Sequence, residues 1–536
     1  MSFDIREFAK LPRSQESFSA LRRSGKIYVD KTALIYNLAF TEDKYFIARP
    51  RRFGKTLLIS TLESLFKYGL RDFKGLAIEK LWHDHTYPVI HLDFSKCDDL
   101  NSFEDFKNQY TGIVETAFAR AGLPLPPVKT EFDTLSVRVD RVFTFMPETF
   151  NPVFLIDEYD SPLNSCLQDS RMFKAIHDEL QLFYKIVKAH GGKFRFLFMT
   201  GICKYRNLDI FSGNNNITDV SLYTDFGTLL GYTDEEVRHY FAPFIEHAAT
   251  ILGISFEECI SSLKQHYDGF CFDEKASSHV FAPWSVLSFL RNPARGFKNY
   301  WYDSGGQSAV LLNYIKNHSL LSPEEYGKDQ YVSFEDLDSS QELEVINPQV
   351  LLTMAGYLTI KKADPDGDLF TVNYPNEEVR TSIRRLYADK IFTKAPKYVI
   401  GMSALALFSQ ESPERIVVLL NQVFEKIDYA RYPIKDEASL RGYLQMYVEG
   451  GGIDTVTEKH NAYGRSDLEF VAQKRYVVIE LKFSKDADDE ELLLKKAVTQ
   501  IKEKHYGEQS HPELEHIRMA LVFSENKRQF VKNCFC

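Results

Sequence analysis

The stretch from Tyr45 to Thr56 constrains the fold of this chain more than any other. It reads Tyr-Phe-Ile-Ala-Arg-Pro-Arg-Arg-Phe-Gly-Lys-Thr, which is an apolar run, then a basic loop, then Gly54-Lys55-Thr56. A helical pattern follows directly, with four leucines and Phe66 on one face. A strand, a glycine-containing loop and a helix start form the local structure in which backbone N–H groups bind phosphate. The sequence therefore predicts an α/β fold with a phosphate-binding loop near its beginning.

Each residue of this loop has an expected role. Gly54 lets the backbone approach a phosphate, Lys55 reaches the terminal phosphates, and the Thr56 hydroxyl holds Mg²⁺. The usual loop opens on a glycine, at the position where this chain has an arginine. The alternative interpretation is a basic loop at a helix start with a solvated Lys55. The remaining candidate nucleotide contacts in the loop are Arg49, Arg51, Arg52 and Phe53.

A second apolar run, residues 152–160, ends in acids and reads Pro-Val-Phe-Leu-Ile-Asp-Glu-Tyr-Asp. A central strand buried on both faces has this composition. Ligands bind at the carboxyl ends of strands in open α/β sheets. Asp157 is therefore expected to hold the Mg²⁺ of a nucleotide, and Glu158 to polarise an attacking water as a catalytic residue. An acid after an apolar run is common at strand ends, but its position after a Gly-Lys-Thr loop makes it more specific.

Two further apolar runs complete the predicted parallel sheet. Residues 87–95 form a strand that lies between the two motifs in the sequence, and residues 194–201 form a strand that ends in Thr200. In such folds a polar group at this place sits between the attacking water and the terminal phosphate. The alternative is that Thr200 only ends a strand before a glycine turn. We expect a P-loop NTPase core with an additional strand between the two Walker motifs.

Several stretches together resemble the AAA-ATPase-like family of bacterial proteins. The family's phosphate loop also reads Arg-Pro-Arg-Arg-Phe-Gly-Lys, so Arg49 departs from generic loops and not from this family. The resemblance covers most of the chain and implies ATP and Mg²⁺ as cofactors. Many members carry a C-terminal nuclease domain of the PD-(D/E)XK superfamily. The stretches are Tyr28–Thr32, Arg49–Thr56, Leu155–Asp160, and Thr200-Gly201 with Phe211–Asn215.

The middle of the chain separates two chemically distinct ends. Residues 231–345 are mostly helical in pattern and are a candidate lid over the nucleotide, although core packing is the preferred interpretation of their aromatic residues. Residues 346–425 contain a hairpin signal, Asp364-Pro-Asp-Gly-Asp368, and a helical connector. We expect an AAA-like ATPase core over 1–230 and a restriction-endonuclease-like α/β domain over 426–536. Between them we expect a helical lid or winged middle region, with the lid over 231–345 and a small β-hairpin plus helical connector over 346–425.

The second candidate site lies on a predicted hairpin, residues 464–470 and 475–483. Side chains two residues apart on a strand share a face, so Glu480 and Lys482 point the same way. Asp467, on the neighbouring strand, can approach Glu480. Two carboxylates can hold Mg²⁺, and Lys482 can orient a water or stabilise developing charge. A charged pair on an exposed strand face is the alternative for Glu480 and Lys482 considered alone.

The order of these residues along the chain resembles the restriction-endonuclease-like core of the PD-(D/E)XK superfamily. Glu437 on the preceding helix adds a ligand or an outer contact, and Gln500 lies on the following helix. Because the core positions are filled, the resemblance implies an active nuclease. The set expected to be catalytic here is Glu437, Asp467, Glu480, Lys482 and Gln500, and the expected metal ligands of the whole chain are Thr56, Asp157, Asp467 and Glu480.

Composition limits the partners and the compartment. The net charge of −10 excludes a generally basic nucleic-acid binder, so any nucleic-acid contact must come from local patches. The seven cysteines are scattered without a Cys-x-x-Cys pair, which argues against a disulfide framework or a zinc ribbon. With no signal-peptide pattern and no membrane-length apolar run, we expect a cytoplasmic protein that does not contact membranes.

These features lead to two hypotheses about function. The first is an ATP-binding or ATP-hydrolysing protein whose nucleotide state regulates a Mg²⁺-dependent nuclease that acts on nucleic acid, DNA more than RNA, with defence against foreign DNA as a family-level analogy. The second is a nucleotide-dependent switch or assembly protein whose C-terminal domain binds nucleic acid or a partner without cutting. A DNA-translocating motor ranks last, because no helicase-type motif set is visible. The loop arginines act either within one chain or on a neighbouring copy in a homo-oligomer.

Overall fold

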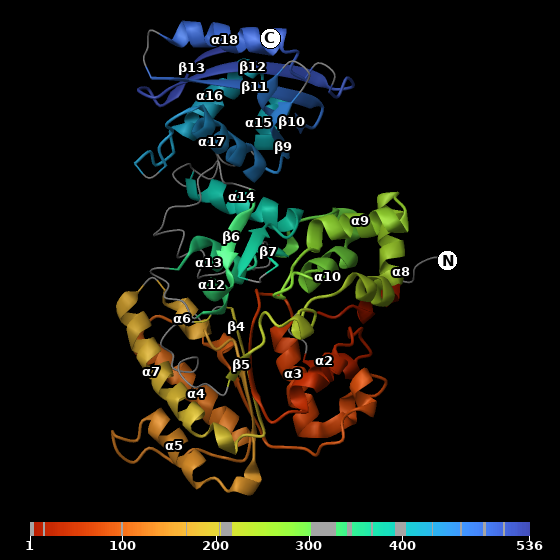
Figure 1. Cartoon of the computed structure of the whole chain (residues 1–536), viewed down its shortest axis with the longest axis vertical. Coiled ribbons are helices and arrows are strands. Elements are labelled where there is room, and N and C mark those ends of the chain that lie inside the picture. The colour runs from red at the N-terminus through yellow and green to blue at the C-terminus, as the bar shows by residue number, and fades with distance from the viewer. Residues whose placement is uncertain are drawn as a thin grey trace. The chain divides into compact units, whose positions relative to one another are not determined.

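The computed structural model forms two compact units, which are described separately (Figure 1). The first contains the described residues up to Val379 except Lys328, and the second contains those from Arg380 to Cys536. The predicted division into four segments stays a prediction. The predicted landmark at 211–215 lies outside the described residues. These are residues 5–13, 17–97, 100–167, 169–202, 204, 217–301, 328–339, 346–365, 368–391, 404–430, 432–460, 464–485, 489–507 and 510–536.

A five-stranded parallel sheet organises the first unit. Its strand order is β2-β3-β4-β1-β5. The additional strand predicted between the two motifs in the sequence forms as β2, and β4 lies between β1 and β3 in the sheet. β2 lies at the edge of the sheet, next to β3. The strands are β1 (Lys44–Ala48), β2 (Val89–Asp93), β3 (Val153–Asp157), β4 (Phe196–Gly201) and β5 (Ile217–Asp219).

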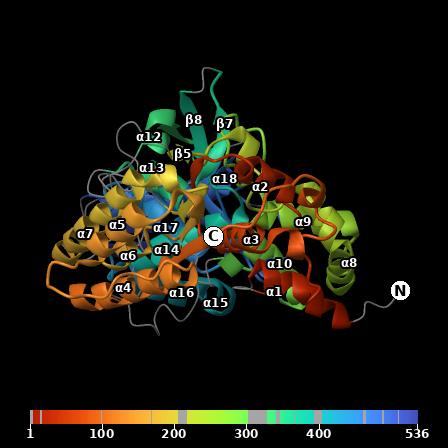
Figure 2. The same ribbon diagram turned by 90° about the horizontal axis from the view of Figure 1, so that it is seen from below.

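Helices cover both faces of this sheet, as Figures 1 and 2 show. Successive side chains of a strand point to opposite faces. Tyr45 and Ile47 therefore join the core with α1 (Phe18–Arg23), α2 (Thr32–Ala39) and α3 (Lys55–Tyr68). Phe154 faces the other layer, where it meets Phe118 and Phe143 edge-on. That layer consists of α4 (Phe103–Arg120), α5 (Leu135–Phe145), α6 (Ser161–Ser165) and α7 (Ser170–Ala189).

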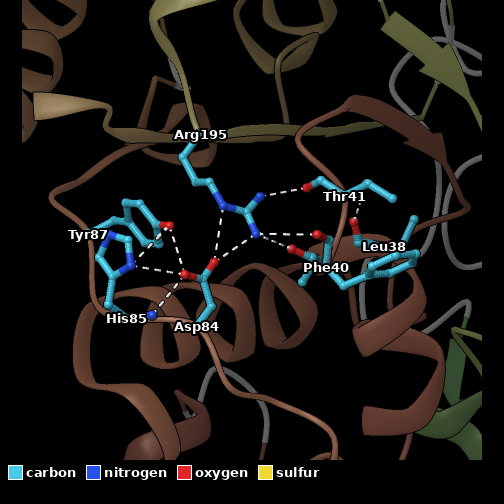
Figure 3. Close-up of polar contacts among 8 residues, drawn as sticks. Leu38, Phe40, Thr41, Asp84, His85, Tyr87 and Arg195 are labelled. Carbon is cyan, nitrogen blue, oxygen red and sulfur yellow. Dashed lines mark hydrogen bonds and ion pairs between the residues drawn. The ribbon is translucent and has the colours of Figure 1, made fainter. Parts of the chain in front are cut away.

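A buried arginine fixes the edge of the sheet opposite the carboxyl ends of its strands (Figure 3). Arg195 directly precedes β4, and its guanidinium is buried. It donates to the carbonyls of Ala39 and Thr41 at 3.0 and 2.6 Å, and to Asp84 Oδ2 at 2.8 and 3.1 Å. Carbonyls at the end of a helix have no partner within the helix. Arg195 therefore closes the C-terminal end of α2 and ties it to β4.

The rest of the first unit is mainly helical, as predicted. α8 (Asp234–Leu252) and α9 (Phe256–Tyr267) each begin at a capping box, Thr233 with Glu236 and Ser255 with Glu258. α10 (Pro283–Arg291) packs with them in one apolar core. The shorter helices are α12 (Phe334–Asp338) and α13 (Pro348–Met354), and α14 (Glu377–Ile391) begins at the end of this unit.

A small antiparallel sheet completes the first unit, in the order β6-β8-β7. The predicted hairpin forms from β7 (Thr359–Ala363) and β8 (Leu369–Asn373). The third strand, β6 (Gln330–Ser333), falls in a region expected to be helical. It pairs with β8 over its whole length, from Gln330 with Val372 to Ser333 with Leu369. This partner lies far along the chain, so the short local pattern did not reveal it.

The second unit is built on a mixed five-stranded sheet in the order β13-β12-β11-β10-β9. β11 and β12 are parallel, and the other pairs are antiparallel. β10 and β11 form the predicted hairpin, with Leu468 paired with Ile479. The strands are β9 (Thr455–His460), β10 (Arg465–Ala472), β11 (Arg475–Ser484), β12 (Glu515–Ser524) and β13 (Gln529–Phe535).

After α14, the helices in the described part of this unit are α15 (Ala404–Gln410), α16 (Pro413–Phe424), α17 (Glu437–Gly450) and α18 (Glu490–Glu503). α18 places Ala497 and Ile501 against Tyr476 and Val478 of β11. This α/β arrangement agrees with the predicted restriction-endonuclease-like domain. In neither unit does a described helix have the length and apolar character needed to cross a membrane.

Candidate active sites

The first candidate site surrounds the segment from Arg49 to Thr56, called the P-loop below. β1 ends one residue before it, and α3 begins at Lys55. The backbone takes a left-handed conformation at Arg52 (φ 70°) and at Gly54 (φ 100°). This conformation is unfavourable for arginine, so the surrounding contacts must hold it. The turn leads into the first N–H groups of α3, which lack partners within the helix and favour an anion.

Lys55 is buried and folds back onto the P-loop. Its Nζ donates to the carbonyls of Arg49 at 2.9 Å and Pro50 at 3.1 Å. Burial lowers the pKa of this ammonium, while the carboxylates of Glu158 and Asp157 act in the opposite direction. The lysine of the P-loop and the acids at the end of β3 are therefore electrostatic neighbours, as the sequence predicts for a shared site.

Asp157 and Thr200 meet at the carboxyl ends of β3 and β4. The Thr200 hydroxyl donates to Asp157 Oδ1 at 2.6 Å and accepts from the Glu158 N–H at 3.1 Å. Asp157 is fully buried, and within the described residues its Oδ2 has no hydrogen-bond donor. Buried carboxylate oxygens normally have partners. The unsatisfied oxygen therefore fits a residue that holds a hydrated divalent cation, because Mg²⁺ takes oxygen ligands and keeps several waters.

Glu158 follows Asp157 in a left-handed conformation, with φ 50°. Burial raises the pKa of its carboxyl group, and the charge of Lys55 partly opposes that effect. A raised pKa makes a carboxylate a better proton acceptor, which suits a group that polarises water. Its position beside Lys55 and Asp157 is consistent with the predicted catalytic role.

The other P-loop side chains divide into packed and outward ones. Arg49 is buried and donates to the carbonyls of Ala48, Ser221 and Phe226 at 2.9, 2.7 and 3.3 Å. Burial lowers its pKa to about 9. Arg49 therefore connects the segments that follow β1 and β5. Its predicted contact with phosphate stays a prediction. The Phe53 ring packs edge-on against two aromatic rings, Arg51 is half-buried, and Arg52 and Thr56 are exposed.

The second candidate site lies on β10 and β11. Lys482 Nζ donates to Glu480 Oε1 at 2.9 Å and lies 3.4 Å from Glu437 Oε2. Asp467 Oδ2 accepts from the Leu481 N–H at 2.8 Å. The structure therefore brings Glu437, Asp467, Glu480 and Lys482 together, although they come from one helix and two strands.

Electrostatics distinguish the two central groups of this cluster. Burial and the neighbouring charge of Asp467 raise the pKa of Glu480 to about 7. Burial lowers the pKa of Lys482, but Glu480 and the other carboxylates more than offset this and hold it above its ordinary value. Glu480 Oε2 is buried and has no hydrogen-bond donor within the described residues. A divalent cation would neutralise the crowded carboxylates and satisfy this oxygen, so the residues fit a metal site.

Two protein families match these two regions of the sequence. Residues 12–211 match the family described as "Predicted AAA-ATPase". Residues 435–533 match the PD-(D/E)XK nuclease superfamily. The chain carries an AAA-ATPase-like domain and a PD-(D/E)XK nuclease superfamily domain. The P-loop and Asp157 fall in the first domain, and the Asp467–Glu480–Lys482 cluster falls in the second.

The chain is also similar to whole proteins. It is 25% identical over 535 residues to an uncharacterised protein from the 5′ region of vnfD in Azotobacter chroococcum, covering 97% of this chain and 98% of that one. A solved structure of the ORC2 protein of Aeropyrum pernix, in ADPNP and ADP complexes, aligns with 68% of this chain and 93% of its own, at 12% identity and a TM-score of 0.22. That TM-score is too low to carry a fold assignment, which rests on the family matches and the strand order.

Gln500, the fifth predicted residue of this site, makes no hydrogen bond to the central cluster among the described residues. Gln500 is half-buried on α18, and within the described part of the chain its side chain makes no hydrogen bond to Asp467, Glu480 or Lys482. The same part of the chain holds no group of three or more His, Cys, Asp or Glu side chains arranged to bind a metal. The two carboxylates would therefore supply only part of a ligand set, as is usual for Mg²⁺.

Sequence reasoning missed Arg441 in this domain. Its Nη1 lies 3.5 Å from Asp467 Oδ1. It is one helical turn after Glu437 on α17, and residues at this spacing share a helix face. That spacing was the signal that could have identified it. In the AAA-ATPase-like domain no local signal predicted that Arg49 would be buried.

Proposed function

We propose that this protein binds and hydrolyses ATP with Mg²⁺ at the P-loop, and that its nucleotide state regulates a Mg²⁺-dependent nuclease on the same chain. The observation that carries the proposal is the convergence of Asp467, Glu480 and Lys482, with a buried unsatisfied oxygen on Glu480. The substrate is nucleic acid, with DNA favoured over RNA. The cytoplasm and defence against foreign DNA form the proposed setting.

At the P-loop, each residue has a defined task. Lys55 exchanges its bonds to the Arg49 and Pro50 carbonyls for phosphate oxygens, while the first N–H groups of α3 bind the same phosphate chain. Asp157 and Thr56 would hold Mg²⁺, which supplies neutralisation of the phosphate charge. Glu158 orients and polarises the attacking water, and Thr200 fixes Asp157 and the backbone of Glu158.

At the nuclease site, Asp467 and Glu480 would hold Mg²⁺, which supplies charge neutralisation and a more acidic bound water. The Leu481 N–H fixes the orientation of Asp467. Lys482 stays protonated beside its carboxylates, so it can donate to the water or to the developing charge on the phosphate. Glu437 holds the Lys482 ammonium from the side of α17.

The test is cleavage by the purified full chain with Mg²⁺, with and without ATP, on plasmid, linear and single-stranded DNA and on RNA. We expect Lys482→Ala to abolish cleavage and leave ATP binding unchanged. Lys485→Ala, which changes an exposed lysine after the same strand, is the matched control and should cut normally. Normal cutting by Lys482→Ala would show that the nuclease assignment is wrong. If the wild-type chain cuts none of these substrates, the nucleotide-dependent switch is the better description.

A further inference from the structure

The P-loop is held by residues that lie beyond the matched AAA-ATPase-like domain. A Cβ placed on Gly356 would come within 2.7 Å of Pro50, so these two residues touch. The three following residues meet aromatic side chains. All of these partners belong to the first unit but come after residue 211, where the family match ends. The contacts are Pro50 with Gly356, Arg51 with Trp301, Arg52 with Trp284, and Phe53 with Phe270 and Phe272.

Trp301 fixes the backbone where the P-loop turns left-handed. Its indole N–H donates to the Arg51 carbonyl at 3.1 Å. The next residue, Arg52, has φ 70°, so this bond holds one end of the strained peptide. The Trp301 ring is fully buried and packs edge-on against Tyr357, with 5.1 Å between ring centroids. Rotation of the indole away from the loop would therefore require repacking of this core.

One buried carboxylate bonds Trp301 and Ser285, the residue that follows Trp284. Glu378 is 1% exposed. Its Oε1 accepts from the Trp301 backbone N–H at 2.7 Å, and its Oε2 accepts from the Ser285 hydroxyl at 2.6 Å. Ser285 directly follows Trp284 on α10, and the Arg52 guanidinium lies 4.7 Å from the centre of the Trp284 ring.

We propose that Glu378 is a positioning residue of the nucleotide site, which sets the affinity of the P-loop for ATP through Trp301 and Ser285. This inference rests on the proposed binding of ATP. A buried carboxylate is costly unless oriented donors satisfy it, so the bonds from Trp301 and Ser285 constrain the Trp301 backbone and the start of α10 together. That arrangement in turn fixes the Arg51–Arg52 peptide that leads into Gly54 and Lys55.

The first test is binding of a fluorescent ATP analogue, mant-ATP with Mg²⁺, to the full chain. Glu378→Gln keeps the shape but replaces one acceptor oxygen with an amide N–H₂, and we expect roughly five- to tenfold weaker binding. Asp84→Asn is the matched control, because it also weakens a carboxylate contact in the first unit but lies at the opposite edge of the sheet. It should lower the urea midpoint and leave mant-ATP affinity unchanged.

The second test separates positioning from general destabilisation. Trp301→Phe keeps an aromatic ring against Tyr357 but removes the indole N–H, and it should weaken binding by a similar factor. The double variant Glu378→Gln/Trp301→Phe should bind mant-ATP only slightly more weakly than either single variant, because both changes disturb the same set of contacts to the P-loop. If Glu378→Gln does not fold, the mant-ATP affinity of Trp301→Phe is compared with that of the Asp84→Asn control to test the positioning role.

The outcomes are distinct. Normal mant-ATP binding by Trp301→Phe, or fully additive losses in the double variant, would overturn the role of Glu378. Failure of the wild-type chain to bind mant-ATP would instead remove the proposed nucleotide site itself. Intrinsic fluorescence gives an independent check, because two of the three tryptophans touch the P-loop. Nucleotide should change the wild-type emission and change it less in Glu378→Gln.

Discussion

The Thr200 hydroxyl donates to Asp157 Oδ1 at 2.6 Å across two neighbouring parallel strands. The same oxygen accepts from the Glu158 N–H. One hydroxyl therefore sets the orientation of both acidic residues at the end of β3. Because these contacts do not involve the P-loop, they should influence catalysis more than nucleotide affinity.

Thr200→Val should separate these two effects. Loss of the hydroxyl leaves the Glu158 N–H and Asp157 Oδ1 without their partner, and the ATPase kcat should fall roughly ten- to a hundredfold. Affinity for ATP should change by about threefold or less. Thr41→Val is the control, since it removes a hydroxyl bonded to the Leu38 carbonyl and to Tyr45, away from Asp157. Steady-state ATPase kinetics decide, and an unchanged kcat in Thr200→Val would remove Thr200 from the site.

Lys55→Met should weaken mant-ATP binding by about a hundredfold or more, because the variant loses the ammonium that meets the phosphates. The side chain is buried, so a methionine of similar shape should keep the fold. Lys67→Met, on the same helix, is the control because this lysine is partly exposed and lies 3.9 Å from Glu63. Equal loss of binding in both variants would mean that charge in general, and not the P-loop lysine, attracts the nucleotide.

The raised pKa of Glu480 predicts an unusual pH dependence for the unfolding free energy of the metal-free protein. Its pKa rises from 4.5 to about 7 on folding, so between these values the folded state holds a proton that the unfolded state has released. The contribution of this group to stability therefore falls as pH rises through that window. Urea midpoints in EDTA from pH 5 to 8 should show this fall in the wild type and a smaller one in Glu480→Gln.

Mg²⁺ should reverse this trend in the wild type. A cation binds the ionised carboxylate and competes with the proton, so Mg²⁺ affinity should increase with pH up to about 7 and then level off. Calorimetric titration of Mg²⁺ at several pH values measures this directly. A flat affinity across the range would show that Glu480 is not a ligand.

Arg195→Ala should destabilise the first unit without changing the residues of either candidate site. It leaves the carbonyls at the end of α2 and the carboxylate of Asp84 without their donor, which should cost about 3 kcal/mol. Urea denaturation measures the cost. Because Arg195 directly precedes β4 and Asp157 ends the parallel strand β3, the guanidinium lies at the opposite edge of the sheet from Asp157, and mant-ATP affinity below the transition should match the wild type.

Much of the fold and of both sites followed from local patterns. Four strands of the parallel sheet, β1 to β4, lie in apolar runs, and the polar residues near the ends of β3 and β4, Asp157 and Thr200, meet at one edge of the sheet. The pairing of Glu480 with Lys482 followed from the two-residue period of a strand. These features depend on short-range geometry, so sequence was sufficient.

The unpredicted features depend on contacts between distant parts of the chain. Arg49 resembles a phosphate ligand in the sequence, but in the structure its guanidinium donates to the carbonyls of Ser221 and Phe226, which lie far along the chain. The bond from Trp301 to Arg51 joins residues far apart along the chain, and no periodicity marks it. Gln500 has the expected place on α18, and its catalytic role stays a prediction.

The folded-back Lys55 has a consequence for the resting protein. Its ammonium is bonded to two carbonyls of its own loop, and these bonds help to hold the P-loop in one shape. Each binding event is then an exchange of partners for one cation, and not the assembly of a new surface. Occupancy should accordingly follow the concentration of ATP.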